Sequence, residues 1–115
     1  MSVKIYHNPR CSKSRQTLKL LQAQGIEPEI IEYLKTPPNA EELDAILQKL
    51  GIEPRTLMRK QESAYKEAGL DNDALDRQAL INGMVHNPIL IERPIVVAND
   101  KAVIGRPPES VLAIL

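Results

Sequence analysis

The fold of this chain is decided by residues 3–34, which read "VKIYHNPRCSKSRQTLKLLQAQGIEPEIIEYL". Residues 3–6 form a short run with β-branched side chains, which is typical of a strand. The stretch from about Cys11 to Gln24 predicts a helix, and Gly25 is a suitable residue for its end. Residues 27–34 predict a second strand. Strand, helix and strand at this spacing predict two parallel strands joined by a right-handed crossover.

A helical block is predicted between about residues 36 and 88. Its clearest helix begins with Asn39, because Glu42 three positions later completes the pattern of a capping box. Apolar side chains then recur at helical spacing up to Gly51, which ends the helix. Three less regular segments are also predicted in this block: a short helix from Arg55 to about Gln61, a turn near Tyr65, and a helix from Asp73 to about His86.

The last part of the chain predicts a hairpin and a short helix. The runs "IVVA" (95–98) and "AVI" (102–104) flank "NDK", which is the pattern of a tight antiparallel hairpin. The segment "PESVLAIL" (108–115) predicts a short helix with proline near its start. Without the helical block, the order is β-α-β followed by β-β-α. We therefore predict an α/β fold, a thioredoxin-like mixed sheet with a helical insertion of about 50 residues, in one domain covering residues 1–115.

The composition excludes several classes of function. The chain has 115 residues, of which 43% are hydrophobic, so it can bury a core without disulfides. Its 15 basic and 15 acidic side chains give zero net charge, which argues against nucleic-acid binding by a basic face. No apolar run approaches the roughly 18 residues of a membrane span, and the N-terminus shows no apolar signal segment. We expect a cytoplasmic protein without nucleic-acid or membrane partners, whose single cysteine stays reduced.

That cysteine, Cys11, is predicted to follow a strand and a turn and to open a helix. Unpaired backbone N–H groups and the helix dipole at such a position favour a thiolate, the nucleophilic form of cysteine. Arg15 lies one helical turn further on the same face, and Arg10 and Lys13 add positive charge nearby. The same amides and guanidinium would also bind an oxyanion. The alternative is that Cys11 is an inert, buried side chain, as most free cysteines are.

The remaining residue pattern limits the chemistry further. His7 lies four residues before Cys11, where it either hydrogen-bonds the thiolate or ends the strand. His86 fits a favourable charge at a helix end better than a catalytic role. The motif "CSKS" places Ser14 where a second cysteine would stand in a Cys-x-x-Cys motif. Any oxidised or loaded Cys11 must therefore be resolved by an external thiol. No metal-ligand spacing is present, so we expect no metal.

Five motifs give the chain a family resemblance. They are "YHNPRCSKSR", "YLKTPP", "LMRKQESAYKEAGL", "HNPILIERPIVV" and "GRPPESVL", in this order along almost the whole chain. As a set they resemble the ArsC-type arsenate reductases, which use glutathione and glutaredoxin and share a thioredoxin-like fold with the Spx-type regulators. The resemblance implies that Cys11 is the nucleophile. It implies three oxyanion-binding arginines, which are Arg59, Arg93 and Arg106. It also implies supporting residues around the cysteine: His7, Asn8, Ser14, Arg15 and Pro94, the last as a cis proline.

The activity that the resemblance implies is the reduction of arsenate to arsenite. Its partners are then arsenate, glutathione as co-substrate, and glutaredoxin, and no tightly bound cofactor is needed. Planar, permanently charged guanidinium groups suit an oxyanion with several acceptor oxygens better than lysine does. Each of the three arginines taken singly fits an ordinary surface ion pair better, and only their convergence on Cys11 would make them a site.

Two features depart from the family pattern. Arg10 stands beside Cys11 where a small residue is expected, and the sequence stops at Leu115, soon after the "GRPPESVL" segment. Both lead us to keep two alternatives open. One is a related thiol reductase or deglutathionylating enzyme with a substrate other than arsenate. The other is a regulator of the Spx type that binds RNA polymerase, although that class usually carries a Cys-x-x-Cys switch.

Overall fold

The computed structural model describes residues 2–115. The chain divides into two compact units: the first joins the residues up to Thr36 to Arg93–Leu115, and the second is Pro37–Glu92. The second unit corresponds to the predicted helical insertion and ends at Glu92 instead of residue 88. The expectation that the two units form one domain stays a prediction.

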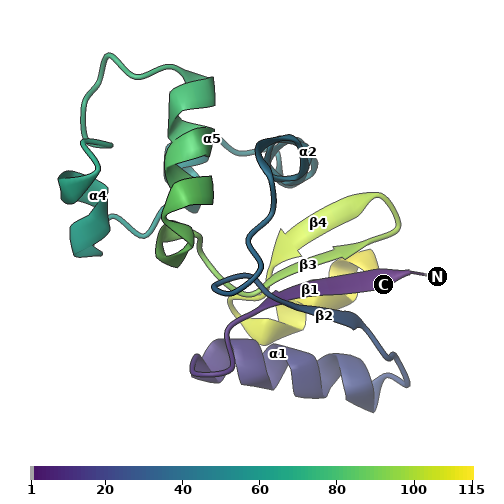
Figure 1. The fold of residues 1–115 in the computed structure, drawn as a ribbon. Helices are drawn as coiled ribbons and strands as arrows, with labels where there is room; N and C mark the ends of the chain where they lie inside the picture. The colour runs from purple at the N-terminus through teal and green to yellow at the C-terminus, as the bar shows by residue number, and fades with distance from the viewer. Residues whose placement is uncertain (1) are drawn as a thin grey trace. The chain divides into compact units, whose positions relative to one another are not determined.

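The first unit is built on a mixed four-stranded sheet (Figure 1). Strand β1 pairs in parallel with β2 and antiparallel with β3, and β3 pairs antiparallel with β4, giving the order β2-β1-β3-β4. This sheet, with the β-α-β and β-β-α order around it, confirms the predicted thioredoxin-like fold. The strands are β1 (Val3–His7), β2 (Glu29–Glu32), β3 (Ile95–Ala98) and β4 (Lys101–Ile104).

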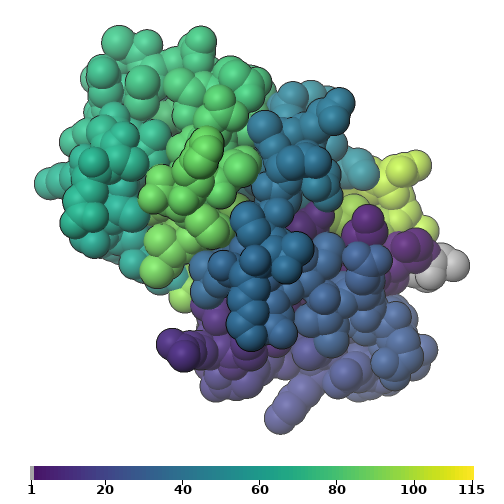
Figure 2. Space-filling model, in the orientation of Figure 1, coloured from purple at the N-terminus to yellow at the C-terminus, as the bar shows by residue number. Residues whose placement is uncertain are grey.

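Helix α1 (Ser12–Ala23) and the 3₁₀ helix η2 (Pro108–Ile114) supply the other half of the core of this unit. Successive side chains of a strand point to opposite faces of the sheet. Every second side chain of β1 and β3 therefore packs against these helices. The outer surface of α1 stays open to solvent (Figure 2). The buried cluster consists of Val3, Ile5, Leu21, Val96, Ala98, Val111 and Ile114.

The ends of several strands meet at one edge of the sheet. In the parallel pair, His7 at the end of β1 lies opposite Glu32 at the end of β2. In the hairpin, Ile95 lies opposite Ile104, so β3 begins where β4 ends. The other end of this hairpin is a two-residue turn in which both Asn99 and Asp100 have positive φ angles, 54° and 60°, as a type I′ turn requires. The predicted hairpin is therefore confirmed, and its open end lies at the same edge as the loop that follows β1.

The second unit is helical. Asn39 caps helix α2 with the capping box expected from the sequence, since its side chain accepts from the Glu42 N–H and the Glu42 side chain accepts from the Asn39 N–H. Gly51 ends this helix in the left-handed conformation. The helices are α2 (Ala40–Leu50), α3 (Pro54–Leu57), α4 (Ser63–Glu67), α5 (Arg77–His86) and the 3₁₀ helix η1 (Pro88–Leu90).

Three boundaries and the type of one helix differ from the sequence predictions. Helix α5 begins at Arg77 rather than Asp73, because Asp76 caps it and the Asn72 side chain accepts from the Ala74 N–H in a local turn. Helix α3 stops at Leu57, since the next residue forms a β-bridge with Ile91. The second strand covers four residues instead of eight. The C-terminal helix is a 3₁₀ helix. No helix within residues 2–115 is long and apolar enough to cross a membrane.

Candidate active site

Cys11 lies at the junction between β1 and α1, as the sequence predicts. It is the N-cap residue of α1, with extended backbone angles. Its N–H donates to the Asn8 carbonyl at 3.0 Å, and its carbonyl accepts from the Arg15 N–H at 3.0 Å. The side chain makes no capping hydrogen bond, so the sulfur does not stabilise the start of the helix. Cys11 is 8% exposed. The sulfur therefore sits at a positive helix end without a structural task of its own.

The Arg106 side chain contacts this sulfur. Its Nη2 lies 3.7 Å from Cys11 Sγ, across 95 positions of sequence. Its Nε donates to the Arg93 carbonyl at 2.9 Å, which fixes the guanidinium in place. A cationic donor next to sulfur favours the thiolate. Arg106 therefore lies beside the Cys11 sulfur, and its role as an oxyanion ligand stays a prediction.

Arg93 belongs to the same edge of the sheet. It precedes Pro94 through a cis peptide bond, the conformation that the resemblance implies, and a second cis bond joins Arg106 to Pro107. Nε and Nη1 of Arg93 are buried. The Gly105 N–H donates to the Pro94 carbonyl at 2.9 Å, which ties the two arginine-bearing segments together. The backbone of Arg93 therefore positions Arg106, and its role as an oxyanion ligand stays a prediction.

Gly105 packs closely against Thr17 and Pro94. A Cβ atom at this residue would lie 2.7 Å from Thr17 Oγ1 and 2.9 Å from Pro94 Cγ. Thr17 is buried in α1, and its hydroxyl donates to the Lys13 carbonyl at 2.8 Å. Glycine is therefore needed because the Arg106 segment runs directly against the helix that carries Cys11 at its start. The sequence analysis assigned no role to Thr17 or Gly105.

His7 and Ser14 form a buried pair beneath the loop. His7 Nδ1 lies 2.6 Å from Ser14 Oγ, which also accepts from the Asn8 N–H at 3.1 Å. Burial lowers the pKa of His7 below 6.5; the Glu32 carboxylate opposes this shift and the Arg15 guanidinium adds to it. The neutral imidazole is therefore favoured. The hydrogen-bond partner of His7 is Ser14. The position of His7 therefore fits a role in stabilising the loop better than direct proton transfer with Cys11.

The other two arginines near the cysteine have separate partners. Arg15 donates from Nη1 to the Pro9 carbonyl at 2.9 Å, so it holds the loop before α1. The Arg10 N–H donates to Asn8 Oδ1 at 3.0 Å, and the Arg10 side chain is exposed. Asn8 and Arg15 thus bind the loop backbone, and their supporting roles in the site stay a prediction.

Arg59 lies in the second unit. Its N–H donates to the Leu90 carbonyl at 2.7 Å, directly after the bridge between Met58 and Ile91. Its Nη2 lies 3.3 Å from Glu62 Oε2. These contacts define the surroundings of Arg59 inside its own unit, and its participation in binding an oxyanion stays a prediction.

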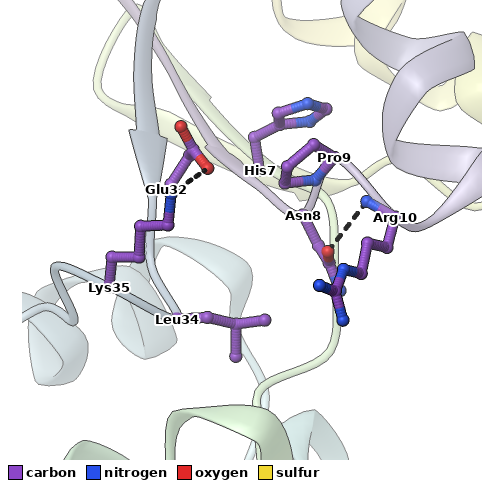
Figure 3. A pocket seen from close by; sticks show the side chains of 7 residues that line it. All are labelled: His7, Asn8, Pro9, Arg10, Glu32, Leu34 and Lys35. Atoms are coloured by element: carbon purple, nitrogen blue, oxygen red, sulfur yellow. Dashed lines mark hydrogen bonds and ion pairs between the residues drawn. The ribbon is translucent and has the colours of Figure 1, made fainter.

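A pocket adjoins the loop at the edge of the sheet, and the sequence analysis did not predict it. It has a volume of about 220 Å³ and is lined by His7, Asn8, Pro9, Arg10, Glu32, Leu34 and Lys35 (Figure 3). The parallel pairing of β1 and β2 was the available signal, because it places residues 32–35 beside the loop that leads to Cys11. Among residues 2–115, no group of three or more His, Cys, Asp or Glu side chains is arranged to hold a metal.

The fold and the site together define a class of protein. It is thioredoxin-like, with an isolated cysteine at the start of its first helix and an arginine from the end of the last hairpin against the sulfur. The sequence model of the ArsC family matches residues 6–114. The chain belongs to the ArsC family.

Individual relatives agree with this assignment. Over 114 residues, the chain is 59% identical to "Uncharacterized protein YfgD" of Escherichia coli K12, covering 98% of this chain and 96% of the relative. It is 52% identical to an arsenate reductase of Neisseria meningitidis serogroup A, covering 98% and 97%. Among solved structures, an arsenate reductase from Vibrio cholerae superposes with a TM-score of 0.96 at 56% identity, covering 100% of this chain and 98% of the other.

Proposed function

We propose that this protein reduces arsenate to arsenite, with Cys11 as the nucleophile and external thiols as the reductant. The observation that carries this proposal is the 3.7 Å contact between Arg106 Nη2 and Cys11 Sγ at the start of α1. A guanidinium at this distance can hold an anionic oxygen beside the attacking sulfur. Relatives named arsenate reductase match over nearly the whole chain, which supports the choice of substrate.

Arsenate binding is the first step of the proposed reaction. Arg106 and Arg93 supply guanidinium groups from one edge of the sheet, and Arg59 is proposed as the third. The N–H groups of the first turn of α1 add donors that have no partner within the helix. The same charges stabilise the additional negative charge as arsenic accepts the sulfur.

Covalent attack by Cys11 follows. The thiolate forms an S–As bond, and a hydroxide or water leaves arsenic, which remains As(V). His7 is not proposed as a base, because its hydrogen-bond partner is Ser14 and because Arg106 and the helix start can stabilise the attacking sulfur. His7 and Ser14 instead hold the loop, with Asn8 and Arg15, in the conformation that presents the sulfur.

The two electrons come from two external thiols. Glutathione adds to the arsenic of the adduct and displaces a second oxygen. Glutaredoxin then attacks the sulfur of that glutathione, and the electron pair of the As–S bond stays on arsenic, giving As(III) and a mixed disulfide. Water releases arsenite, and Cys11 leaves as a thiolate. An external thiol is required because Cys11 is the only cysteine in the chain. A reducing compartment suits this scheme, and we propose a cytoplasmic location.

A coupled assay tests the proposal. Arsenate-dependent oxidation of NADPH is followed with glutathione, glutaredoxin and glutathione reductase, and the rate is compared with that of Cys11→Ser. We expect turnover for the natural protein and none above background for the variant. Equal rates would overturn the proposal. Glutathione mixed disulfides are assayed in parallel, since faster turnover of these would indicate the alternative deglutathionylating activity.

A further inference from the structure

The pocket beside Arg10 adjoins the loop that holds the reactive cysteine. Arg10 directly precedes Cys11, and the Asn8 carbonyl accepts the Cys11 N–H at 3.0 Å. Opposite this loop lie Glu32 at the end of β2, and Leu34 and Lys35 just after it. Figure 3 shows the Leu34 side chain directed toward the Arg10 guanidinium. Three of the lining residues are therefore within three positions of the nucleophile, although the mechanism above uses neither the Arg10 side chain nor the residues that follow β2.

Positive side chains outnumber negative side chains in this pocket. Arg10 and Lys35 carry positive charges, whereas Glu32 is the one anion among the seven lining residues. Lys35 Nζ lies 3.6 Å from Glu32 Oε1, with side chains that are 79% and 44% exposed. An ion pair this open is weak and easily exchanged for another partner. The pocket thus offers two sites for carboxylates and one for an ammonium group, around the apolar surface of Leu34 and Pro9.

We propose that this pocket binds a carboxylate-bearing arm of the peptide thiol that serves as co-substrate, an inference that rests on the function proposed above. A tripeptide thiol such as glutathione carries a carboxylate and an ammonium group together on its γ-glutamyl arm, and these match the charges of Arg10 and Glu32. The pocket volume of about 220 Å³ is below the roughly 300–1,000 Å³ of sites that enclose a whole small molecule. One arm of the peptide therefore enters the pocket, and the remainder extends along the loop toward Cys11.

This assignment accounts for the cation at position 10. A planar guanidinium binds a carboxylate through two parallel hydrogen bonds, which also orients the ligand. Asn8 supports this geometry, because its side chain accepts the Arg10 N–H and fixes the backbone from which the guanidinium extends. Arg10 is thus proposed as a binding residue for the reductant, separate from the arginines proposed for arsenate.

Binding is tested with S-methylglutathione, which has no free thiol and cannot react with Cys11. Its addition to the ¹⁵N-labelled natural protein should shift the backbone amide signals of Asn8, Leu34 and Lys35. In Arg10→Ala, we expect the dissociation constant to rise about tenfold, because the exposed guanidinium–carboxylate contact is lost. Lys101→Ala, an exposed cation on β4, serves as the matched control and should bind as the natural protein does. The same spectra show that each variant is folded.

Two results would overturn the assignment: shifts confined to other residues, or an unchanged dissociation constant in Arg10→Ala. The same shifts with inorganic phosphate, lost equally in Arg10→Ala, would also overturn it, because the pocket would then be an oxyanion site. In turnover, Arg10→Ala should raise the KM for glutathione far more than the KM for arsenate. A protein without arsenate turnover that still binds S-methylglutathione here would refute the proposed function and support the pocket.

Discussion

Replacing Arg106 by alanine should slow the reaction of Cys11 with an alkylating reagent. The change removes the guanidinium whose Nη2 lies 3.7 Å from Sγ. Two unit charges at this distance interact by about 1 kcal/mol in water and about 4 kcal/mol at an effective dielectric constant of 20. Arg106 is an exposed residue, so the lower part of that range applies, about 1–2 kcal/mol. At 1.36 kcal/mol for each factor of ten, the alkylation rate should fall about 5- to 30-fold.

The assay is the rate of alkylation by iodoacetamide at pH 7, followed by intact mass. Because the chain has one cysteine, the mass increase reports Cys11 alone. Each rate is divided by the rate of the same variant in concentrated urea, where the folded contact is absent. Arg106→Lys keeps the charge but loses the anchor from Nε to the Arg93 carbonyl, and should fall between alanine and the natural residue. Lys101→Ala, a surface cation, should react like the natural protein.

An Arg106→Ala variant that is folded and alkylated as fast as the natural protein would refute the electrostatic role of this contact. An equal effect of Lys101→Ala would refute it too, because the cause would then be net charge and not the local geometry. Salt gives a further check: the difference between Arg106→Ala and the natural protein should shrink as ionic strength rises, since exposed charges are screened.

Three further outcomes follow from the packing of the site. Gly105→Ala should lower the free energy of unfolding by about 1–3 kcal/mol, because its Cβ would lie 2.7 Å from Thr17 Oγ1; an unchanged urea midpoint would contradict this. Ser14→Ala should cost about 1–3 kcal/mol by leaving His7 Nδ1 and the Asn8 N–H without their common partner, again measured with urea. His7 has a pKa held below 6.5 by burial, so its contribution to stability is present above pH 6.5 and is lost as the pH falls through the folded-state value. Its NMR titration should therefore have a midpoint below 6.5, and a higher midpoint would exclude burial as the dominant influence.

Much of the fold could be predicted because local signals agree with the tertiary structure. The capping box at Asn39 and the hairpin around Asn99 depend on only a few neighbouring residues, so the sequence alone predicts them. Helix and strand boundaries were less accurate. The start of α5 depends on competition between Asp73 and Asp76 for the cap, and composition alone does not decide it. The C-terminal segment begins with two prolines that lack N–H groups, and its bonds close tighter 3₁₀ turns, such as the one from Ser110 to Pro107.

The site was also predicted only in part, because some of its contacts join residues that are far apart in the sequence. Cys11 could be placed from the strand–turn–helix pattern alone, since its position depends on adjacent residues. The contact with Arg106 spans 95 positions, and only the family resemblance pointed to it. The pocket was missed because Glu32 and Lys35 have no motif of their own. They become neighbours of the cysteine loop through the register between β1 and β2, which sequence periodicity does not specify.

The two-residue turn at Asn99 and Asp100 has a consequence for how this protein can change. The turn sets the register in which Ile104 faces Ile95, and that register determines how far the chain has travelled when it reaches Arg106. One residue added or removed in the turn would shift β4 by about 3.3 Å and reverse which face its side chains meet. The turn lies at the opposite end of the hairpin from the sulfur, yet its length influences the distance between Arg106 and Cys11. A change of length in the turn should therefore displace Arg106 from the sulfur, whereas a substitution there that tolerates a positive φ should leave the contact in place.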